Sequence, residues 1–459
     1  MRRKNAWTTY NKKQLDELEK LCKNYLKFLD KGKTERECVK QIVKQAEEKG
    51  YVNLADITKD KKALKAGDKV YSVCMDKTVA LFQIGKKKLE KGMNILGAHI
   101  DSPRMDVKQN PLYESEEFAY LDTHYYGGIK KYQWVTLPLA LHGVVVKKDG
   151  TVITVNVGED KNDPVFCVTD LLIHLAGEQM EKKANKVIEG ENLDVLVGSK
   201  PLEGKEKDAV KEGILEILKE KYDMTEEDFM SAEIEVVPAG HAREAGLDHS
   251  MVMSYGQDDR VCSYANLEAI LQAKPGVKTQ AALLTDKEEI GSYGNTGMES
   301  SYFVKFVMKL LALQGKDAIL DFYETMENSE MLSADVNSCM DPMFAEVSEK
   351  DNASFLGYGI NLTKYGGARG KSGSNDANAE FLQKIRTIFN EAGVCWQIGE
   401  LGKVDQGGGG TIAFMMADWG AEVVDCGTAM LSMHAPYDLL SKADAYETYL
   451  AYKAFFESK

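Results

Sequence analysis

Five short segments of the chain carry histidine and carboxylate side chains of the kind that bind metal ions. They are GAHIDSPR (97–104), GQDDR (256–260), TDKEEIGS (285–292), SADVN (333–337) and MHAPYD (433–438). Each places a His, Asp or Glu directly after an expected strand or in a loop. In open α/β sheets, ligand sites gather at the carboxyl ends of strands, so residues far apart in sequence can converge on one site.

The residue types indicate which metals such a site would hold. His99 and His434 offer imidazole nitrogens, and Asp258, Glu289 and Asp335 offer carboxylate oxygens. This mixture suits zinc, with manganese or cobalt as replacements. Two histidines and three carboxylates can hold two ions if one carboxylate bridges them, and such a pair activates water for hydrolysis.

Two further acids stand beside the candidate ligands. Glu288 directly precedes Glu289, and neighbouring residues at a strand end point in different directions, so one acid can bind metal while the other acts as general base. Asp101, two residues after His99, can accept the second ring proton of that histidine and fix its tautomer. Singly these signals are weak, since paired acids are usually solvated or cap a helix. Only the set of five segments carries the hypothesis.

The expected elements place these segments on an α/β framework. A helical spacing covers 11–29, two strands cover 69–84, and the apolar run 93–98 ends at a histidine. Later in the chain we expect helices at 259–272, 302–313, 377–391 and 443–457, and strands at 281–285, 331–336, 394–398 and 421–425. This alternation is typical of a sheet covered by helices.

The middle of the chain has a different character. Residues 134–157 are β-rich around a turn at Asp149–Gly150, and 178–222 are rich in lysine and glutamate and are expected to be helical. We therefore predict an α/β domain in two parts, 1–104 and 241–459, with an inserted β-rich domain at 105–240.

Composition narrows the class of protein. The 459 residues carry a net charge of −14, which argues against nucleic acid or an anionic membrane as partner. The eight cysteines form no CxxC pair, which is typical of free thiols in a reducing compartment. Neither a signal-peptide core nor an apolar stretch of about 18 residues is evident, so a cytoplasmic location is expected.

The five segments together resemble the M18 family of metalloaminopeptidases, also called the aspartyl aminopeptidase or aminopeptidase I family, over nearly the whole chain. HIDSPR, DKEEIGS and SAD are the most specific matches, and the segments follow the family order, with the insertion between the first two. The resemblance is closest to the bacterial branch. It implies a zinc aminopeptidase fold on a mixed sheet and an inserted domain that makes dimer contacts. It also implies peptide substrates with a free N-terminus and assembly into a tetrahedral dodecamer.

The resemblance also implies roles for individual residues. His99, Asp258 and Asp335 would hold one metal ion, and Asp258, Glu289 and His434 the other, with Asp258 bridging. Glu288 would be the general base.

The sequence departs from the aspartyl aminopeptidases near the expected substrate pocket. Two positions where those enzymes carry histidine correspond to Asp341 and Asp170. An acidic N-terminal substrate residue would be repelled there, and a basic or neutral one favoured. Lys364 and Lys371 oppose this expectation, because either could bring a positive charge to the pocket.

Two alternatives stay open at this point. Related two-metal folds remove acyl groups from amino acids, and the EEIG and DDR elements alone would fit such a deacylase. A non-catalytic oligomeric shell could also keep the fold. The HIDSPR segment and the large insertion favour the aminopeptidase over the first alternative, and the intact ligand set favours it over the second.

Overall fold

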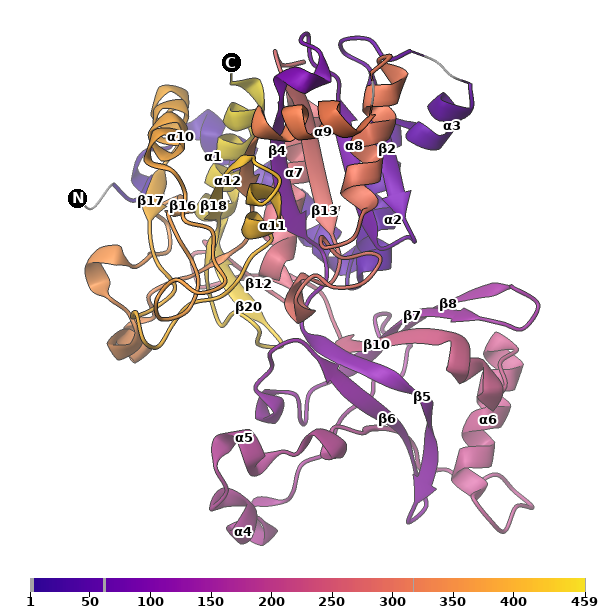
Figure 1. Cartoon of the computed structure of the whole chain (residues 1–459). Helices are drawn as coiled ribbons and strands as arrows, with labels where there is room; N and C mark the ends of the chain where they lie inside the picture. The colour runs from indigo at the N-terminus through magenta and orange to yellow at the C-terminus, as the bar shows by residue number, and fades with distance from the viewer. Residues whose placement is uncertain (1–3, 61–62, 317, 459) are drawn as a thin grey trace. The chain divides into compact units, whose positions relative to one another are not determined.

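The computed structural model describes residues 4–60, 63–316 and 318–458. Its backbone contacts divide the chain into two compact units (Figure 1). The first unit comprises Met1–Asp101, Ala242–Met433 and Asp438–Lys459, and the second comprises Ser102–His241 and His434–Tyr437. The domain boundaries predicted from the sequence place 434–437 in the same domain as their neighbours, unlike this division. Those predicted boundaries stay a prediction.

The first unit is built on a nine-stranded mixed sheet, which agrees with the α/β class expected from the sequence. In sheet order the strands are β1 (Val52–Asn53), β2 (Lys69–Cys74), β3 (Thr78–Gln83), β13 (Thr279–Thr285), β4 (Met93–His99), β14 (Glu330–Ser333), β18 (Glu422–Gly427), β16 (Ile360–Thr363) and β17 (Trp396–Ile398). The four central strands β13, β4, β14 and β18 run parallel. Their carboxyl ends therefore meet at one edge of the sheet.

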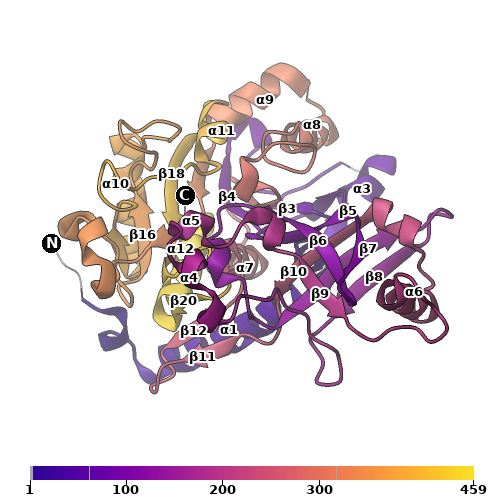
Figure 2. The same ribbon diagram turned by 90° about the horizontal axis from the view of Figure 1, so that it is seen from below.

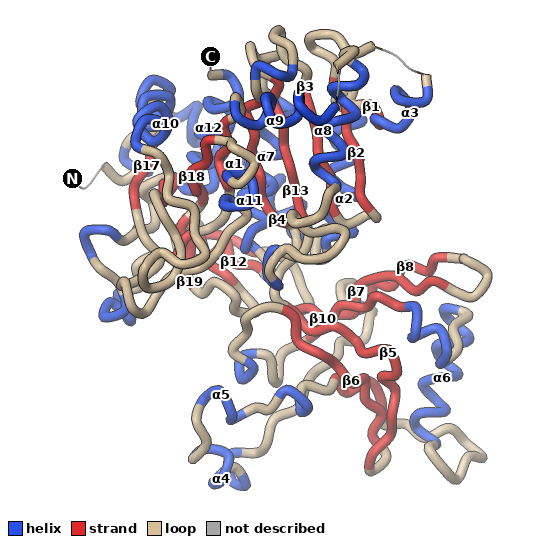
Figure 3. The backbone as a smooth tube through the Cα atoms, in the orientation of Figure 1, coloured by secondary structure: helices blue, strands red, loops and turns tan. Residues whose placement is uncertain are grey.

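Helices cover both faces of this sheet (Figure 3), because alternate residues of the strands point into two separate hydrophobic cores. Leu96 and Ala98 of β4 belong to one core, and Met93 and Ile95 belong to the other. The first core packs under α1 (Lys12–Lys31), α2 (Glu35–Glu48), α7 (Gln257–Gln272), α10 (Ala379–Ala392) and α12 (Lys442–Glu457). The second packs under α3 (Leu54–Lys59), α8 (Tyr302–Leu313), α9 (Ala318–Glu327) and α11 (Ala413–Ala417).

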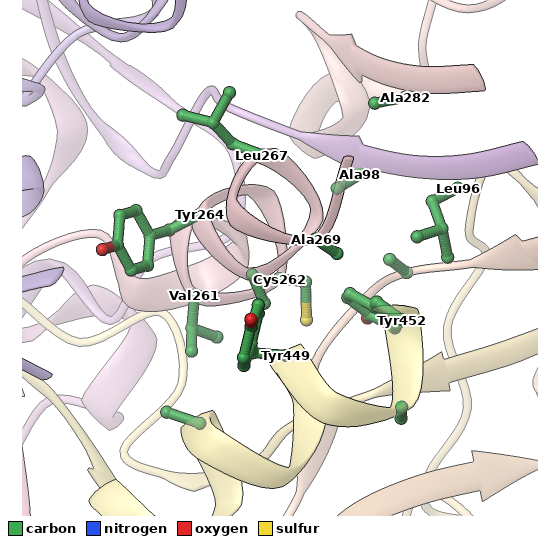
Figure 4. Packing of buried hydrophobic residues seen from close by; sticks show 14 of the residues in the cluster. Leu96, Ala98, Val261, Cys262, Tyr264, Leu267, Ala269, Ala282, Tyr449 and Tyr452 are labelled. Atoms are coloured by element: carbon green, nitrogen blue, oxygen red, sulfur yellow. The ribbon is translucent and has the colours of Figure 1, made fainter. Parts of the chain in front are cut away.

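The contact of α7 and α12 with β4 forms the centre of the first core. Figure 4 shows Val261 and Cys262 of α7 on the side of that helix that faces Tyr449 and Tyr452 of α12. All of these side chains are almost fully buried. A small sheet in the same unit joins β11 (Arg243–Ala245), β12 (Met251–Ser254), β20 (Asp438–Ser441), β19 (Ala429–Leu431) and β15 (Asn337–Ser338).

The second unit is a six-stranded antiparallel sheet, whose strands Figure 2 shows side by side. In sheet order they are β8 (Val152–Val157), β7 (Leu139–Val146), β10 (Ala232–Pro238), β5 (Arg104–Ser115), β6 (Phe118–Tyr126) and β9 (Val195–Gly198). The helical expectation for 178–222 holds for about half of that range, and it is wrong for the rest. The chain there forms the short helices α4 (Gly177–Met180) and α5 (Ala184–Val187), then β9, and only α6 (Ala209–Tyr222) is a helix of several turns.

The physical reason for this difference is burial. Between 178 and 200 most side chains are exposed, so no apolar stripe holds a long helix against a core. Leu193 and Val195 are instead fully buried at the sheet. Among the described residues, no helix is long and apolar enough to cross a membrane.

Candidate metal centre

Three of the five segments contain the ends of neighbouring parallel strands. The register pairs Thr285 at the end of β13 with His99 at the end of β4. β14 ends two residues before Asp335, and it pairs with β4 on the other side. The turn Glu288–Ile290 begins three residues after the last residue of β13. The parallel strands therefore deliver the histidine, the acid pair and Asp335 to one edge of the sheet.

The segment GQDDR (256–260) lies at the start of helix α7. Buried polar side chains of this helix donate hydrogen bonds to β4. Ser263 Oγ donates a hydrogen bond of 2.6 Å to the carbonyl oxygen of His99, and Asn266 Nδ2 donates one of 3.0 Å to that of Leu96. These bonds fix the helix against the strand. Asp258, in the first turn of the helix, lies with Oδ1 3.3 Å from Nε2 of His99.

Six of the seven predicted site residues therefore come together in the first unit: His99, Asp101, Asp258, Glu288, Glu289 and Asp335. Nε2 of His99 is also 3.9 Å from Oε2 of Glu288 and 3.9 Å from Oδ1 of Asp335. The site contains two sets of three potential ligand atoms, and within each set the three atoms lie within 4.8 Å of one another. One set is His99, Asp258 and Glu289, and the other is His99, Glu288 and Asp335. Each set combines an imidazole nitrogen with carboxylate oxygens, which are zinc ligands in proteins.

Asp101 connects the histidine to the acid pair. Its side chain is fully buried, and Oδ1 lies 3.3 Å from Nδ1 of His99. Oδ1 also accepts the backbone N–H of Glu288, and Oδ2 accepts that of Glu289, both at 3.2 Å. One carboxylate thus orients the ring of His99 and holds the turn that carries both glutamates.

Known proteins are similar to this chain in both sequence and fold. Residues 28–456 match the family described as Aminopeptidase I zinc metalloprotease (M18). A probable M18 family aminopeptidase 1 of Clostridium acetobutylicum is 56% identical over 456 residues, which cover 99% of this chain and 98% of that protein. The chain belongs to the M18 family. Another probable M18 family aminopeptidase 1, from Thermotoga maritima, is 47% identical and covers 100% of this chain and 99% of that protein.

Solved M18 structures have the same fold. The crystal structure of the Thermotoga maritima M18 aminopeptidase superposes with a TM-score of 0.96 at 47% identity, and each chain is covered completely. Aminopeptidase I of Clostridium acetobutylicum gives a TM-score of 0.94 at 54% identity, again with both chains covered completely. A dodecamer from Saccharomyces cerevisiae, 19% identical, gives 0.77 over 96% of this chain and 97% of that chain, and shares the fold. This M18 member is a metalloaminopeptidase, which the matches support over the deacylase and the inert shell.

His434, the remaining predicted ligand of this M18 aminopeptidase, belongs to the second unit by its backbone contacts. Its Nδ1 lies 2.9 Å from the carbonyl oxygen of Gly128 in the same unit, which fits a ring N–H donating to that oxygen. Nε2 would then be free of the proton, as a metal ligand must be. Neither three-residue set found among the described residues includes His434, and its role as a ligand stays a prediction.

The electrostatics of the M18 site fit a cation. Burial and the charge of Glu288 raise the pKa of Asp335 well above its usual range, and burial does the same for Asp259. Burial lowers the pKa of His99, but hydrogen bonds with Asp101 and Asp258 outweigh it and raise the pKa well above its usual value. Several acids crowded in a buried site repel one another, and a divalent ion would relieve that repulsion. The donor set therefore suits the metal that the family description names.

Several residues that build the site were not among those predicted from the sequence. Asp259, next to Asp258, is fully buried, and its Oδ2 accepts the backbone N–H of His99 at 3.4 Å. The buried Arg260 donates to the carbonyl oxygens of Ile100 (3.2 Å) and Lys33 (2.9 Å) and so fixes the loop after β4. The DDR string was the only signal for these two roles.

A second missed group supports the turn after β13. Asp286 accepts hydrogen bonds from Nζ of Lys287 at 2.7 Å and from Oγ1 of Thr296 at 2.5 Å. Lys287 has a positive φ of 68°, which a lysine adopts only when its surroundings hold it there. The TDK string before the glutamates is therefore part of their support.

Proposed function

We propose that this M18 aminopeptidase removes the N-terminal residue of peptides with two bound divalent ions, zinc first and manganese or cobalt as replacements. His99, Asp258 and Asp335 would hold one ion, and Asp258, Glu289 and His434 the other. The observation that carries the proposal is the convergence of four acids on His99 at one sheet edge. When bound, the ions supply Lewis acidity that lowers the pKa of water and neutralises charge developing on the carbonyl oxygen.

Glu288 is the proposed general base. Its side chain is 17% exposed, whereas that of His99 is 2% exposed, so the carboxylate reaches solvent at the rim of the cluster. It takes a proton from the attacking water and passes it to the leaving amine. Asp101 holds the backbone N–H of Glu288 and so keeps the base in register with the ligands.

Cleavage of matched peptides tests this function against the deacylase alternative. The metal-loaded protein is expected to release leucine from Leu-Ala-Ala-Ala and to leave N-acetyl-Leu-Ala-Ala-Ala intact, because the site requires a free α-amine. The assay is repeated with zinc, manganese and cobalt in turn. Hydrolysis of the acetyl group, with the free peptide untouched, would assign the protein to the deacylases.

The preferred N-terminal residue is expected to be neutral or basic. We propose that Asp341 and Asp170 stand near the substrate side chain, which requires the assembled particle. Of the two lysines that could oppose this preference, Lys371 is engaged with other side chains. Nζ of Lys371 lies 2.9 Å from Oδ2 of Asp376 and 3.7 Å from the ring centroid of Tyr365. A like charge beside a partly desolvated substrate carboxylate costs on the order of a few kcal/mol.

This expectation is tested by kcat/KM for the Leu-, Lys- and Asp-nitroanilides at one pH and with one metal. The Asp substrate should be slower than the other two by roughly tens to hundreds of fold, at about 1.4 kcal/mol per factor of ten. Lys364→Met and Lys371→Met serve as matched variants and should change this order little. Faster cleavage of the Asp substrate would refute the proposal and direct attention to these two lysines.

We also propose that the second unit makes dimer contacts and that the dimers build a closed dodecamer. Five apolar side chains of this unit are between 48% and 69% exposed: Leu171, Leu172, Ile173, Leu175 and Met180. An exposed apolar cluster of this kind marks a contact surface. One dodecamer is known among proteins that share the fold.

Light scattering of the purified protein checks the assembly. The wild type should behave as a large particle, and Ile173→Asp together with Leu175→Asp should give smaller ones, because the charges cannot be buried in a contact. Leu247→Asp, at a fully exposed leucine outside the cluster, is the control and should leave the particle intact. A monomeric and fully active wild type would contradict the proposal.

A further inference from the structure

Four consecutive glycines precede α11, and the fold accounts for only the first two. A Cβ on Gly407 would lie 1.6 Å from the carbonyl oxygen of Leu401. A Cβ on Gly408, which has a φ of 119°, would lie 1.9 Å from the carbonyl oxygen of Gly367. No other residue fits these two positions without moving the backbone.

Gly409 and Gly410 are different, because alanine fits at both. The nearest neighbour of a Cβ would be Cδ2 of Leu401 at 3.7 Å for Gly409 and the carbonyl oxygen of Gly373 at 3.5 Å for Gly410, which are ordinary contacts. Neither residue has a positive φ, and both are exposed. Alanine at such positions stabilises a folded chain relative to glycine. Glycine there indicates that another molecule approaches the backbone closely.

A partly buried hydrogen-bond network holds this run next to the strand that leads to a candidate metal ligand. Thr411, the residue after the run, donates from Oγ1 to Oδ1 of the buried Asp425 at 2.7 Å. Ser333 Oγ donates to the same threonine oxygen at 3.4 Å. Ser333 ends β14, two residues before Asp335. The glycine run is thus tied to the sheet edge where the acids and His99 converge.

The run presents hydrogen-bond donors at that edge. The carbonyl oxygen of Gly409 accepts the backbone N–H of Gly367 at 2.9 Å, which fixes the orientation of the run. The N–H groups of Gly408, Gly409 and Gly410 have no acceptor within the part of the chain that the structure describes. A short row of backbone N–H groups with no bulky side chain is suited to bind carbonyl or carboxylate oxygens.

We propose that Gly408–Gly410 is a subsite for the main chain of the peptide substrate beyond the scissile bond, where the glycine N–H groups donate to its carbonyl oxygens. The inference rests on the proposed function, because it needs a peptide bound at the metal cluster. The subsite favours peptides of three or more residues over aminoacyl amides, since only the longer chains carry carbonyl groups that reach it.

Peptide affinity tests the subsite separately from turnover. The dissociation constant of Leu-Ala-Ala-Ala is measured by calorimetry on metal-loaded Glu288→Gln protein, with and without Gly409→Ala or Gly410→Ala. Each alanine keeps its N–H but places a Cβ where the peptide main chain would approach. It should therefore weaken tetrapeptide binding about five-fold, the value of one hydrogen bond, and leave the affinity for leucinamide unchanged. Gly370→Ala is the matched control, because its Cβ also has open space and a permissive φ, and it should change neither affinity.

The second pair of variants tests the anchor. Thr411→Val removes the hydrogen bond to Asp425 and should weaken the tetrapeptide in the same way, whereas Thr411→Ser keeps the hydroxyl and should not. The melting temperature of Gly409→Ala and Gly410→Ala should be equal to or above that of the parent.

Three results would overturn the subsite. The alanine variants could leave tetrapeptide affinity unchanged, or weaken leucinamide binding equally. They could also weaken only the binding of an aspartyl amide, which would show that the glycine N–H groups bind a side-chain carboxylate. A fall in melting temperature in either alanine variant would also overturn it. The wild type could fail to cleave the tetrapeptide while these affinities change as expected. That result would contradict the proposed function but would still support the subsite.

Discussion

Replacing Glu288 with glutamine is expected to lower kcat by about 10²–10⁴-fold, the range measured for loss of a general base. Glutamine has the size of glutamate but cannot accept the proton of the attacking water. The backbone N–H of residue 288 remains bound to Asp101, so the turn and the metal ligands should stay in place. Metal content and melting temperature should therefore match those of the wild type.

Glu289→Gln is the matched control for this experiment, because it makes the same chemical change one residue later. As a proposed ligand, Glu289 should affect metal affinity first, and excess metal should restore part of the activity. Near-native turnover in Glu288→Gln, or loss of metal from it, would show that Glu288 is not the base.

Substitution of Asp258 with alanine should lower metal occupancy at both sites and abolish activity. As the proposed bridge, this carboxylate would touch both ions, and its Oδ1 lies 3.3 Å from Nε2 of His99. His434→Ala should weaken mainly one site, because an imidazole binds a single ion. The measurement is metal content per chain by mass spectrometry after dialysis against a fixed concentration of free metal.

The neighbouring acid provides the control. Asp259→Asn keeps a buried polar group at the position that accepts the N–H of His99, and it should leave both ions bound. Retention of two ions in Asp258→Ala would contradict the bridge. Loss of both ions from His434→Ala would contradict the assignment of Asp258 as the only bridging ligand.

The convergence of the site could be predicted from the sequence because it depends on a few strong local patterns. The apolar runs before His99, Asp286 and Asp335 end in polar groups, and parallel strands align such ends. The helix beginning near Asp258 also follows from its sequence. Local pattern and global topology agree in these elements, so each one reinforces the others.

The supporting contacts could not be predicted, because they depend on register and on partners distant in sequence. The two N–H groups held by Asp101 come from residues 187 and 188 positions later in the chain. Nothing local distinguishes a lysine that takes a positive φ, as Lys287 does, from one that does not. In 178–222 the lysine and glutamate content favoured a helix, but without an apolar stripe the composition did not decide the structure.

Metal titration of metal-stripped protein tests the central claim most directly. Zinc is added in steps while the bound metal per chain and the cleavage of Leu-Ala-Ala-Ala are measured on the same samples. The account predicts that cleavage is absent without metal and rises until two equivalents per chain are bound. Full activity at one equivalent, or activity that survives complete removal of metal, would contradict it.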